Sequence, residues 1–471
     1  MSGGLPRTLF IAVSPGELWA ALREGEELVE LRLFRPGGGG QAGAFYLGRV
    51  VALRPELPAA LVDIGLPRPA FLSAEDAPPR TGLAGLTEGQ AIIVQVMKEA
   101  RADKATGVTA RPRLGGRWLE VTPGRPGIAA ARGLDAAERA RLEAALGEGA
   151  GAAGEAEDGF FLRRAAAGGA AAALLDEAAA LRTRWRAILA RRATVTPPAA
   201  LEEGEPPAVT LIAEFAAAPL DAIVIDDRAA FAATRHWLAV RQPEWAARLA
   251  LHSEAEPLFE LAGIAAAAAG ALAARVPLPG GGALLIAPTA AATLIDVDSG
   301  GAPILTANLA AARTAARQIR LRNLTGAIVI DFISMKRRGE RARVAAALAA
   351  ALADDPAGVE MLGWTRLGHM ELVRKRRHPA LSELLYERDE DGALVKTALT
   401  VALEALRAAV REAAAPAGRG LALHVGPAVA AALTDGPARE ARRALEARLG
   451  QALAVIAEPG RAPATFDIRR R

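Results

Sequence analysis

The chain has 471 residues, of which 52% are apolar and 4% aromatic, and its 57 basic and 53 acidic residues leave a net charge of +4. This apolar content excludes a disordered chain, and the length exceeds what one compact core accommodates, so we expect about two to four domains. Cysteine is absent, which excludes disulfides and cysteine-ligated zinc and favours a reducing compartment.

No segment of the sequence predicts export or a membrane span. The apolar run within residues 1–13 is too short for a secretory signal and has no cleavage pattern. The Ala-rich stretch 262–276 is broken by glycine and closed by arginine, short of the length that crosses a bilayer. We therefore expect a cytoplasmic protein.

The sequence pattern of the first third of the chain is typical of β-structure. Residues 8–35 predict a strand, a short helical piece and a second strand. Residues 44–121 contain five short apolar stretches divided by Gly, Pro and Asp. Five strands of this kind are typical of a small closed barrel of the OB-fold class.

Helical periodicity begins after the predicted barrel. It covers residues 134–149 and about 170–192. The Pro- and Glu-rich segment 194–208 is predicted to be a linker. Alternating strands and helices follow. They include a strand at 222–227, a helix directly after it, and one long helix from 258 to 276. From about residue 387 the pattern is helix, strand, helix, strand.

Two strand-end carboxylates stand out in the stretch TLIDVDSGG. Asp296 and Asp298 are two residues apart, so on a strand both point to one face. Asp331 ends the next apolar run, and an amphipathic helix lies between the two runs. A strand–helix–strand crossover makes the strands parallel and brings the aspartates toward their carboxyl ends, where open α/β sheets bind ligands.

Clustered carboxylates repel one another and stay ionised together when a cation lies between them. Mg²⁺ fits this role, since it takes one or two carboxylates and keeps waters. An aspartate at a strand end also commonly initiates a turn or caps a helix. The residues alone therefore leave a metal site and a local cap as open alternatives.

Two basic runs follow Asp331 in the chain. The runs 335–343 and 363–379 are rich in arginine. Such runs are commonly solvated faces, but beside a metal they suit a polyanionic substrate held by its phosphates. A metal next to phosphates indicates phosphodiester hydrolysis.

Several segments resemble one family, the bacterial ribonuclease E/G family. LIDVDSGG, LTANLAAARTAARQIRLRNLTGAIVIDFISM and GWTRLGHMELVRKRRHPAL are similar to its catalytic core, and FYLGRVVALRPELPAALVDIGLPRPAFL is similar to its RNA-binding OB-fold. The resemblance is to a short, ribonuclease G-like form without the long tail of larger members. It runs nearly end to end, and is loose over residues 120–260.

The resemblance implies an α/β multidomain fold. Its parts are an RNase H-like subdomain with an inserted OB-fold β-barrel and a 5′-sensor region, a DNase I-like α/β catalytic subdomain, and a small C-terminal α/β domain. The implied bounds are 1–40 with 208–276 for the RNase H-like subdomain, 41–121 for the OB-fold, 122–207 for the 5′-sensor-like region and linker, 277–386 for the nuclease subdomain, and 387–471 for the C-terminal domain.

The resemblance also implies roles for the carboxylates. The family cleaves single-stranded RNA with Mg²⁺ held by aspartates at the ends of two strands, and we expect Mg²⁺, or Mn²⁺ in its place, in this chain. Those positions are Asp296 and Asp331. Asp298, at a position often occupied by asparagine, would orient the other two as a third catalytic residue.

RNA contacts are implied at four further residues. Phe71 matches an aromatic of the OB-fold, and Lys98 and Lys104 match its lysines. Together with Arg366, these lysines would hold the phosphate backbone. Leu61 stands where the family has a second aromatic, which removes a stacking platform worth about 1–3 kcal/mol per base. Without the resemblance, Phe71 would be read as barrel core and the lysines as solvated charges.

The resemblance places the family's 5′-monophosphate pocket at Arg163 and Arg164, the latter in place of a threonine. An arginine pair still suits a phosphate. Two other departures from the family's sequence pattern are larger than this substitution. The loop GGAPI at 300–304 is shorter than in the family, and residues 386–394 lack the cysteines of its zinc-bridged dimer. A homodimer could then form only through another surface.

The leading expectation is a Mg²⁺-dependent endoribonuclease that acts on single-stranded RNA in RNA processing and decay. The alternative is an RNA-binding protein of the same family with weakened or lost nuclease activity. The short loop, Leu61 and the missing zinc link favour this alternative, whereas the retained aspartates disfavour it. A scaffolding protein without RNA fits the barrel and the basic runs poorly.

Overall fold

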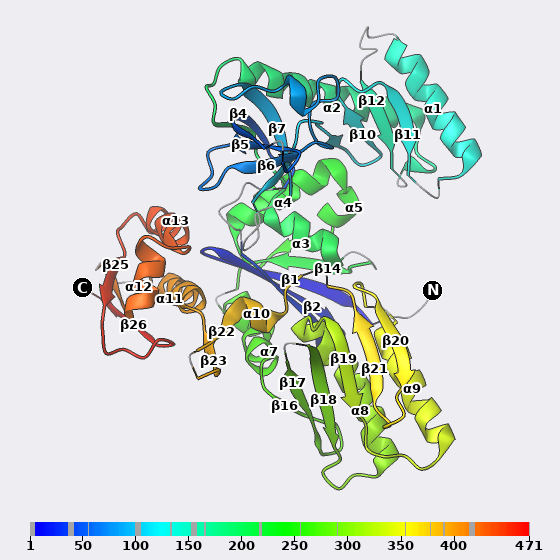
Figure 1. Cartoon of the computed structure of the whole chain (residues 1–471), viewed down its shortest axis with the longest axis vertical. Helices are drawn as coiled ribbons and strands as arrows, with labels where there is room; N and C mark the ends of the chain where they lie inside the picture. Colours follow the sequence, from blue (N-terminus) through cyan, green and yellow to red (C-terminus); the bar gives the residue numbers. More distant parts are fainter. Residues whose placement is uncertain are drawn as a thin grey trace. The chain divides into compact units, whose positions relative to one another are not determined.

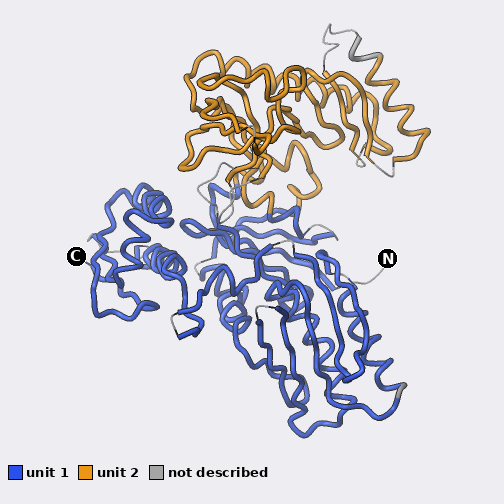
Figure 2. Tube along the Cα trace, in the orientation of Figure 1, with its two compact units in different colours: residues 1–35, 211–231, 248–471 blue, residues 36–210, 232–247 orange. Residues whose placement is uncertain are grey.

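The computed structural model describes most of the chain (Figure 1). The described residues are 5–35, 42–54, 56–98, 105–131, 134–151, 158–163, 166–215, 219–254, 256–289, 291–353, 355–376, 378–389, 391–413 and 420–470. They form two compact units, which Figure 2 colours separately. The first comprises residues 1–35, 211–231 and 248–471, and the second comprises residues 36–210 and 232–247.

The second unit contains the predicted barrel. Its strands run in the order β4-β5-β6-β8-β7, and β7 pairs again with β4. Their apolar side chains fill the interior, including Val50, Val62, Leu72 and Val94. The prediction of a closed five-stranded barrel is therefore confirmed and is consistent with an OB-fold. The strands are β4 Phe45–Arg54, β5 Ala59–Asp63, β6 Ala70–Ser73, β7 Ala91–Lys98 and β8 Gly107–Thr109, and the short helix η1 spans Leu83–Gly85.

A small sheet and the helices α1 and α2 also belong to the second unit, as do most of α4 and all of α5, whose bounds are given below. The predicted helices are present as α1 Ala136–Gly151 and α2 Ala171–Arg192. The predicted linker at 194–208 is wrong, because it contains β13 Ala199–Glu202, which pairs antiparallel with β4 and buries Leu201. The sheet has the order β11-β12-β10-β9, from β9 Leu114–Gly115, β10 Leu119–Thr122, β11 Gly127–Ala130 and β12 Gly159–Leu162.

The first unit begins with a sheet of order β15-β14-β1-β2-β3. The helical piece predicted within residues 8–35 is wrong: three antiparallel strands run through turns in which Gly16 and Gly25 have positive φ. The middle strand is buried on both faces, so its apolar residues are contiguous and lose the alternation that marks a strand. The strands are β1 Arg7–Ser14, β2 Glu17–Glu24, β3 Glu27–Phe34, β14 Ala222–Ile225 and β15 Leu249–Leu251.

Short helices follow the strands of this sheet. The single helix predicted from 258 to 276 is wrong, because Gly263, with φ 68°, separates two short helices. Alanine supplies little apolar surface to hold one longer helix across such a break. The helices are α3 Pro207–Phe215, α4 Arg228–Arg241, α5 Pro243–Ala246, α6 Leu258–Leu261 and α7 Ile264–Gly270.

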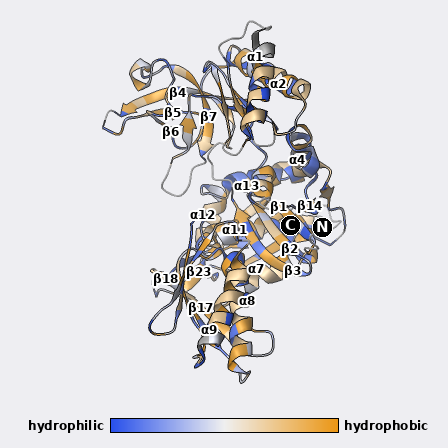
Figure 3. Ribbon diagram, turned by 90° about the vertical axis from the view of Figure 1, so that its right-hand side faces the viewer, coloured by the Kyte–Doolittle hydropathy of each residue, from blue (hydrophilic) through white to orange (hydrophobic). Residues whose placement is uncertain are grey.

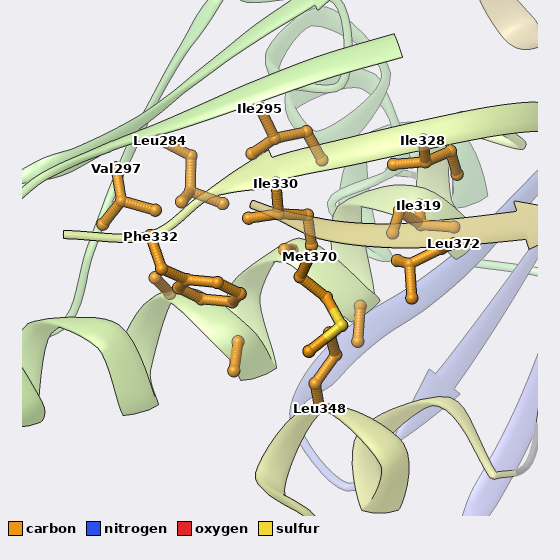
Figure 4. Packing of buried hydrophobic residues seen from close by; sticks show 14 of the residues in the cluster. Leu284, Ile295, Val297, Ile319, Ile328, Ile330, Phe332, Leu348, Met370 and Leu372 are labelled. Atoms are coloured by element: carbon orange, nitrogen blue, oxygen red, sulfur yellow. The ribbon is translucent and has the colours of Figure 1, made fainter. Parts of the chain in front are cut away.

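A second sheet of the first unit has the order β16-β17-β18-β19-β21-β20. Two helices cover one of its faces, and side chains such as Ile330, Phe332 and Met370 fill the space between them (Figure 4). The opposite face carries exposed side chains. The elements are β16 Arg275–Pro277, β17 Ala283–Pro288, β18 Ala292–Asp298, α8 Ile304–Arg322, β19 Gly326–Asp331, α9 Arg338–Leu352, β20 Val359–Trp364 and β21 Met370–Arg374.

The helix between the two aspartate strands is buried on more than its apolar side. Hydrophobic and hydrophilic residues both occur along α8 (Figure 3). Arg317 donates to the carbonyl of Leu28 at 3.0 Å, and Arg320 lies 3.2 Å from Glu30. The arginine side of α8 therefore contacts β3, so the helix lies between the two sheets.

The C-terminal part has the predicted alternation with additions. The predicted elements are present as α11 Ala398–Ala413, β24 Leu421–Val425, α13 Arg439–Leu449 and β25 Ala454–Ala457. The additions are α12 Pro427–Thr434 and β26 Phe466–Arg470, and before this part lie α10 Leu381–Leu385, β22 Tyr386–Arg388 and β23 Leu394–Lys396. Within the described ranges, no helix has both the length and the apolar character needed to cross a membrane.

A buried arginine anchors the second sheet. Arg374, at the end of β21, is fully buried, and its Nε lies 2.8 Å from Asp355 Oδ2. Its Nη1 donates to Asn323 Oδ1 at 2.7 Å and to the carbonyl of Leu324 at 3.1 Å. The expectation that the basic run 363–379 is a phosphate-holding surface is therefore wrong for Arg374, which belongs to the core.

We predict that Arg374→Ala lowers the free energy of unfolding by about 3–5 kcal/mol, because it leaves the carboxylate of Asp355 buried and unpaired. Arg376→Ala is the matched control. Arg376 forms an exposed pair with Glu383, so its loss changes stability by less than about 0.5 kcal/mol. Urea unfolding followed by tryptophan fluorescence measures both. Equal midpoints for the two variants would contradict the prediction.

Candidate functional site

Asp296 and Asp331 face each other across two adjacent strands. Strands β18 and β19 pair in parallel, with Asp296 in register with Asp331. Residues in register on neighbouring strands share a face and have backbones about 4.8 Å apart. Both side chains are exposed. The predicted crossover is confirmed, and both carboxylates lie at the carboxyl end of their strand.

The alternation of the strands sets the direction of these side chains. Ile295, Val297 and Ile330 are buried in the core beneath α8 and α9. The residues between and beside them must therefore point to the open face of the sheet. The apolar pattern of the sequence thus determines where the carboxylates point.

Asp298 has a different environment. Its Oδ2 lies 3.1 Å from Arg275 Nη2, and its Oδ1 accepts a hydrogen bond from the backbone N–H of Gly300 at 3.0 Å. These contacts, the backbone bond first and Arg275 second, lower the pKa of the Asp298 carboxyl. Asp298 therefore forms the local turn that a strand-end aspartate commonly initiates. By contrast, the carboxylate of Asp296 has no hydrogen bond or ion pair with any described residue.

The short loop after Asp298 is a tightly built turn. Gly300 and Gly301 have positive φ. A Cβ on Gly282 would lie 2.1 Å from the carbonyl oxygen of Asp298, and one on Gly300 would lie 2.4 Å from the backbone nitrogen of Gly282. Two backbone segments therefore cross where only glycine fits, and GGAPI connects β18 to α8 within this close packing.

Three residues that sequence reasoning missed support the aspartates. Asn308 of α8 holds the segment after Asp331, since its amide donates to the Ile333 carbonyl at 2.8 Å and accepts from the Ile333 N–H at 3.1 Å. Arg275 pairs with Asp298. His369 Nε2 lies 3.6 Å from Asp331 Oδ1. The pattern that could have identified His369 is the β20–β21 hairpin, because it places His369 beside the end of β19.

The donor set suits a divalent cation held by two carboxylates. No group of three or more His, Cys, Asp or Glu side chains is gathered for metal binding in the described ranges. Mg²⁺ needs no such group, because it binds through one or two carboxylates and fills its other positions with water and substrate oxygens. The exposed, in-register pair therefore fits Mg²⁺. Arg366 is exposed in the turn between β20 and β21.

Within the second unit, the barrel brings Phe71 and Lys98 to one row. Phe71 is in register with Leu61 on one side and with Gly107 on the other, and Lys98 is also in register with Gly107. Phe71 is 39% exposed, so it is not a barrel-core residue. Lys98 is exposed as well, and Lys104 lies outside the described residues.

The predicted 5′-phosphate residues are described only in part. Arg163 follows β12, and its Nη2 lies 3.0 Å from Glu120 Oε1. A Cβ on Gly115 would lie 2.6 Å from this Nη2, so the guanidinium lies directly over Gly115. Its Nε is buried without a hydrogen-bond partner among the residues that the structure describes. Arg164 lies outside them.

Comparison with known proteins gives one family. The sequence model of the Ribonuclease E/G family matches residues 113–377. Ribonuclease G of Escherichia coli K12 is 31% identical and is covered over 99% of its length by 98% of this chain. Ribonuclease G of Haemophilus influenzae is 31% identical over 86% of this chain and 87% of its own. Ribonuclease E of Nostoc is 32% identical over 73% of this chain and 52% of its own. The chain belongs to the ribonuclease E/G family.

Proposed function

We propose that this protein is a Mg²⁺-dependent endoribonuclease that cleaves single-stranded RNA in RNA processing and decay. The observation that carries the proposal is the in-register pair Asp296 and Asp331 at the carboxyl ends of two parallel strands, in a chain whose relatives are named ribonuclease G and ribonuclease E. An exposed pair of unneutralised carboxylates would repel RNA phosphates unless a cation lay between them.

The residues of the first unit have distinct roles in this proposal. Asp296 and Asp331 hold the metal, Asp298 fixes the turn beside them, and Asn308 positions the chain after Asp331. When bound, Mg²⁺ supplies an activated water and stabilises charge on the cleaved phosphate. Arg366, exposed in its hairpin turn, contacts the RNA backbone.

The barrel supplies a second RNA contact. Phe71 stacks on a base and Lys98 binds a phosphate, since both are exposed in one row of the barrel. Lys104 contributes in the same way. Leu61, next to Phe71 in this row, offers no aromatic ring, so the barrel holds one base rather than two.

The finer fold assignment belongs to the same proposal. The sheet containing β1 and β14 would be the RNase H-like subdomain, 1–40 with 208–276, and the sheet containing β18 and β19 the DNase I-like subdomain, 277–386. The remaining proposed bounds are 41–121 for the OB-fold, 122–207 for the 5′-sensor region and 387–471 for the C-terminal domain. We further propose a cytoplasmic location and, with no cysteine to bind zinc, a homodimer through a zinc-free surface.

An RNA-binding protein with lost nuclease activity is the second candidate. Leu61 beside Phe71 and the short GGAPI turn are the observations that favour it. The free carboxylate of Asp296 counts against it, because a pure RNA binder gains nothing from an exposed acidic pair. Activity assays separate the two candidates.

We predict that Asp296→Asn or Asp331→Asn lowers the rate of RNA cleavage at least about 1,000-fold, because each removes part of the metal's several kcal/mol of transition-state stabilisation. Asp391→Asn, an exposed aspartate of the β22–β23 turn, is the control and keeps full activity. The assay uses a single-stranded A/U-rich oligonucleotide with Mg²⁺ or EDTA. Binding without cleavage by the wild-type protein, under Mg²⁺ and Mn²⁺ alike, would establish the second candidate.

Asp298 and Arg275 should affect the Mg²⁺ requirement in opposite directions. Arg275→Ala leaves the charge of Asp298 uncompensated, so the half-saturating Mg²⁺ concentration falls. Asp298→Asn removes that charge and frees Arg275, so it rises. Each shift is about two- to fivefold, because both side chains are exposed. In the double variant Arg275→Ala/Asp298→Asn, the half-saturating Mg²⁺ concentration is close to the wild-type value. Shifts of the same sign in both single variants would contradict this pairing.

Arg163 and Arg164 are proposed to contact a 5′-phosphate, and Glu120 then competes for Arg163 through its ion pair. We predict that Glu120→Gln raises the ratio of cleavage rates for 5′-monophosphate over 5′-hydroxyl substrates about three- to tenfold, as a charge-assisted bond becomes available to the phosphate. Glu143→Gln, which breaks the exposed pair with Arg139, is the control. An unchanged ratio in Glu120→Gln would remove Arg163 from this role.

A further inference from the structure

A histidine extends the row of carboxylates on the open face of the second sheet. Asp296 and Asp331 are in register on β18 and β19. On the other side of β19, Met370 of β21 is opposite Ile330 in an antiparallel pair. The next residue along β19 is Asp331, and the residue before Met370 is His369. Asp296, Asp331 and His369 therefore follow one another across three adjacent strands.

The position of His369 is fixed by its backbone, while its ring contacts only Asp331 among the polar side chains that the structure describes. The turn from Thr365 to His369 is closed by a hydrogen bond from the Thr365 N–H to the His369 carbonyl at 2.8 Å and by one from the His369 N–H to Thr365 Oγ1 at 3.1 Å. The ring Nε2 lies 3.6 Å from Asp331 Oδ1, which is longer than a hydrogen bond. With the described residues, the imidazole forms no hydrogen bond.

An imidazole beside a metal-binding carboxylate changes which ion the site prefers. Carboxylate and water oxygens suit Mg²⁺, whereas imidazole nitrogen suits transition-metal dications and is a poor ligand for Mg²⁺. A solvated surface histidine is the simpler reading of such a residue elsewhere in a chain. Beside Asp331, that simpler reading is a surface ion pair, and the spectra below distinguish it from a metal ligand.

We propose that His369 is a nitrogen ligand of the ion held by Asp296 and Asp331, so that the site binds Mn²⁺ more tightly than Mg²⁺. This inference rests on the metal site of the proposed function and adds a third donor to it. Neighbouring strands are about 4.8 Å apart, so an ion above the central residue, Asp331, is approached from both sides. The imidazole is the longest of the three side chains and has the farthest reach.

Exposure leaves the side chains room to converge. The side chain of His369 is 33% exposed and that of Asp331 is 58% exposed. Rotation about their side-chain bonds is therefore not prevented by close packing, and an ion would draw the separate donors together. Arg275 is paired with Asp298, 3.1 Å away.

Pulsed EPR of the Mn²⁺-loaded full-length protein tests this directly, because a bound imidazole gives a ¹⁴N coupling that carboxylates and water do not give. We expect this coupling in the wild-type protein and in His236→Leu, which removes an exposed histidine of α4. We expect its loss in His369→Leu. Titration calorimetry should show Mn²⁺ affinity falling at least about tenfold in His369→Leu, with Mg²⁺ affinity changing less than about twofold.

The wild-type spectrum alone can overturn the inference. Absence of ¹⁴N coupling, or equal Mn²⁺ affinities of the wild-type protein and His369→Leu, overturns it. Coupling that persists in Asp296→Asn/Asp331→Asn also overturns it, since the ion would then be bound elsewhere. RNA cleavage in Mg²⁺ is a separate readout. Cleavage without coupling rejects the histidine ligand alone, and coupling without cleavage rejects the nuclease alone.

Discussion

The parallel pairing of β18 with β19 is the constraint on which the candidate site depends. In a strand, alternate residues point to opposite faces, so a slip of one residue exchanges the two faces. Such a slip in β19 would turn Asp331 into the core and expose Ile328 and Ile330, which are fully buried. An unpaired carboxylate in an apolar core costs several kcal/mol. The apolar pattern thus aligns the carboxylates by making every other register unfavourable.

The helix that connects these strands is held by charges as well as by apolar contacts. Arg320 of α8 and Arg32 of β3 both contact the buried Glu30. Burial lowers the pKa of Arg32, and the charge of Glu30 opposes this shift. Desolvation offsets most of the attraction in such a network, so its net contribution to stability is small. Its effect is geometric: each charge has one place where it is neutralised, and this fixes α8 between the two sheets.

The sequence was sufficient where local pattern and tertiary environment agree. The five barrel strands are separated by Gly, Pro and Asp, and the β18–α8–β19 unit switches clearly between periods of two and 3.6 residues. Both were predicted and are present. The site carboxylates were found because each ends an apolar run. These features depend only on residues near one another in the chain.

The failures have a common physical cause. Strand β2 lacks the alternation that predicts a strand, because it is buried on both faces. Strand β13 has no clear local signal, because its pairing partner, β4, lies about 150 residues earlier in the sequence. Arg374 is the clearest case. Its sequence context is a basic run, but its charge is neutralised by Asp355, 19 positions away. His369 was missed for the same reason, since only the hairpin brings it to Asp331.

The contacts of Arg374 have a consequence for how the chain tolerates changes in length. Arg374 bonds the side chain of Asn323 and the carbonyl of Leu324, the residues between α8 and β19. An insertion there would move Asp331 relative to its neighbours or break a buried ionic contact. The connection between α8 and β19 must therefore keep its length if Asp331 is to stay beside Asp296.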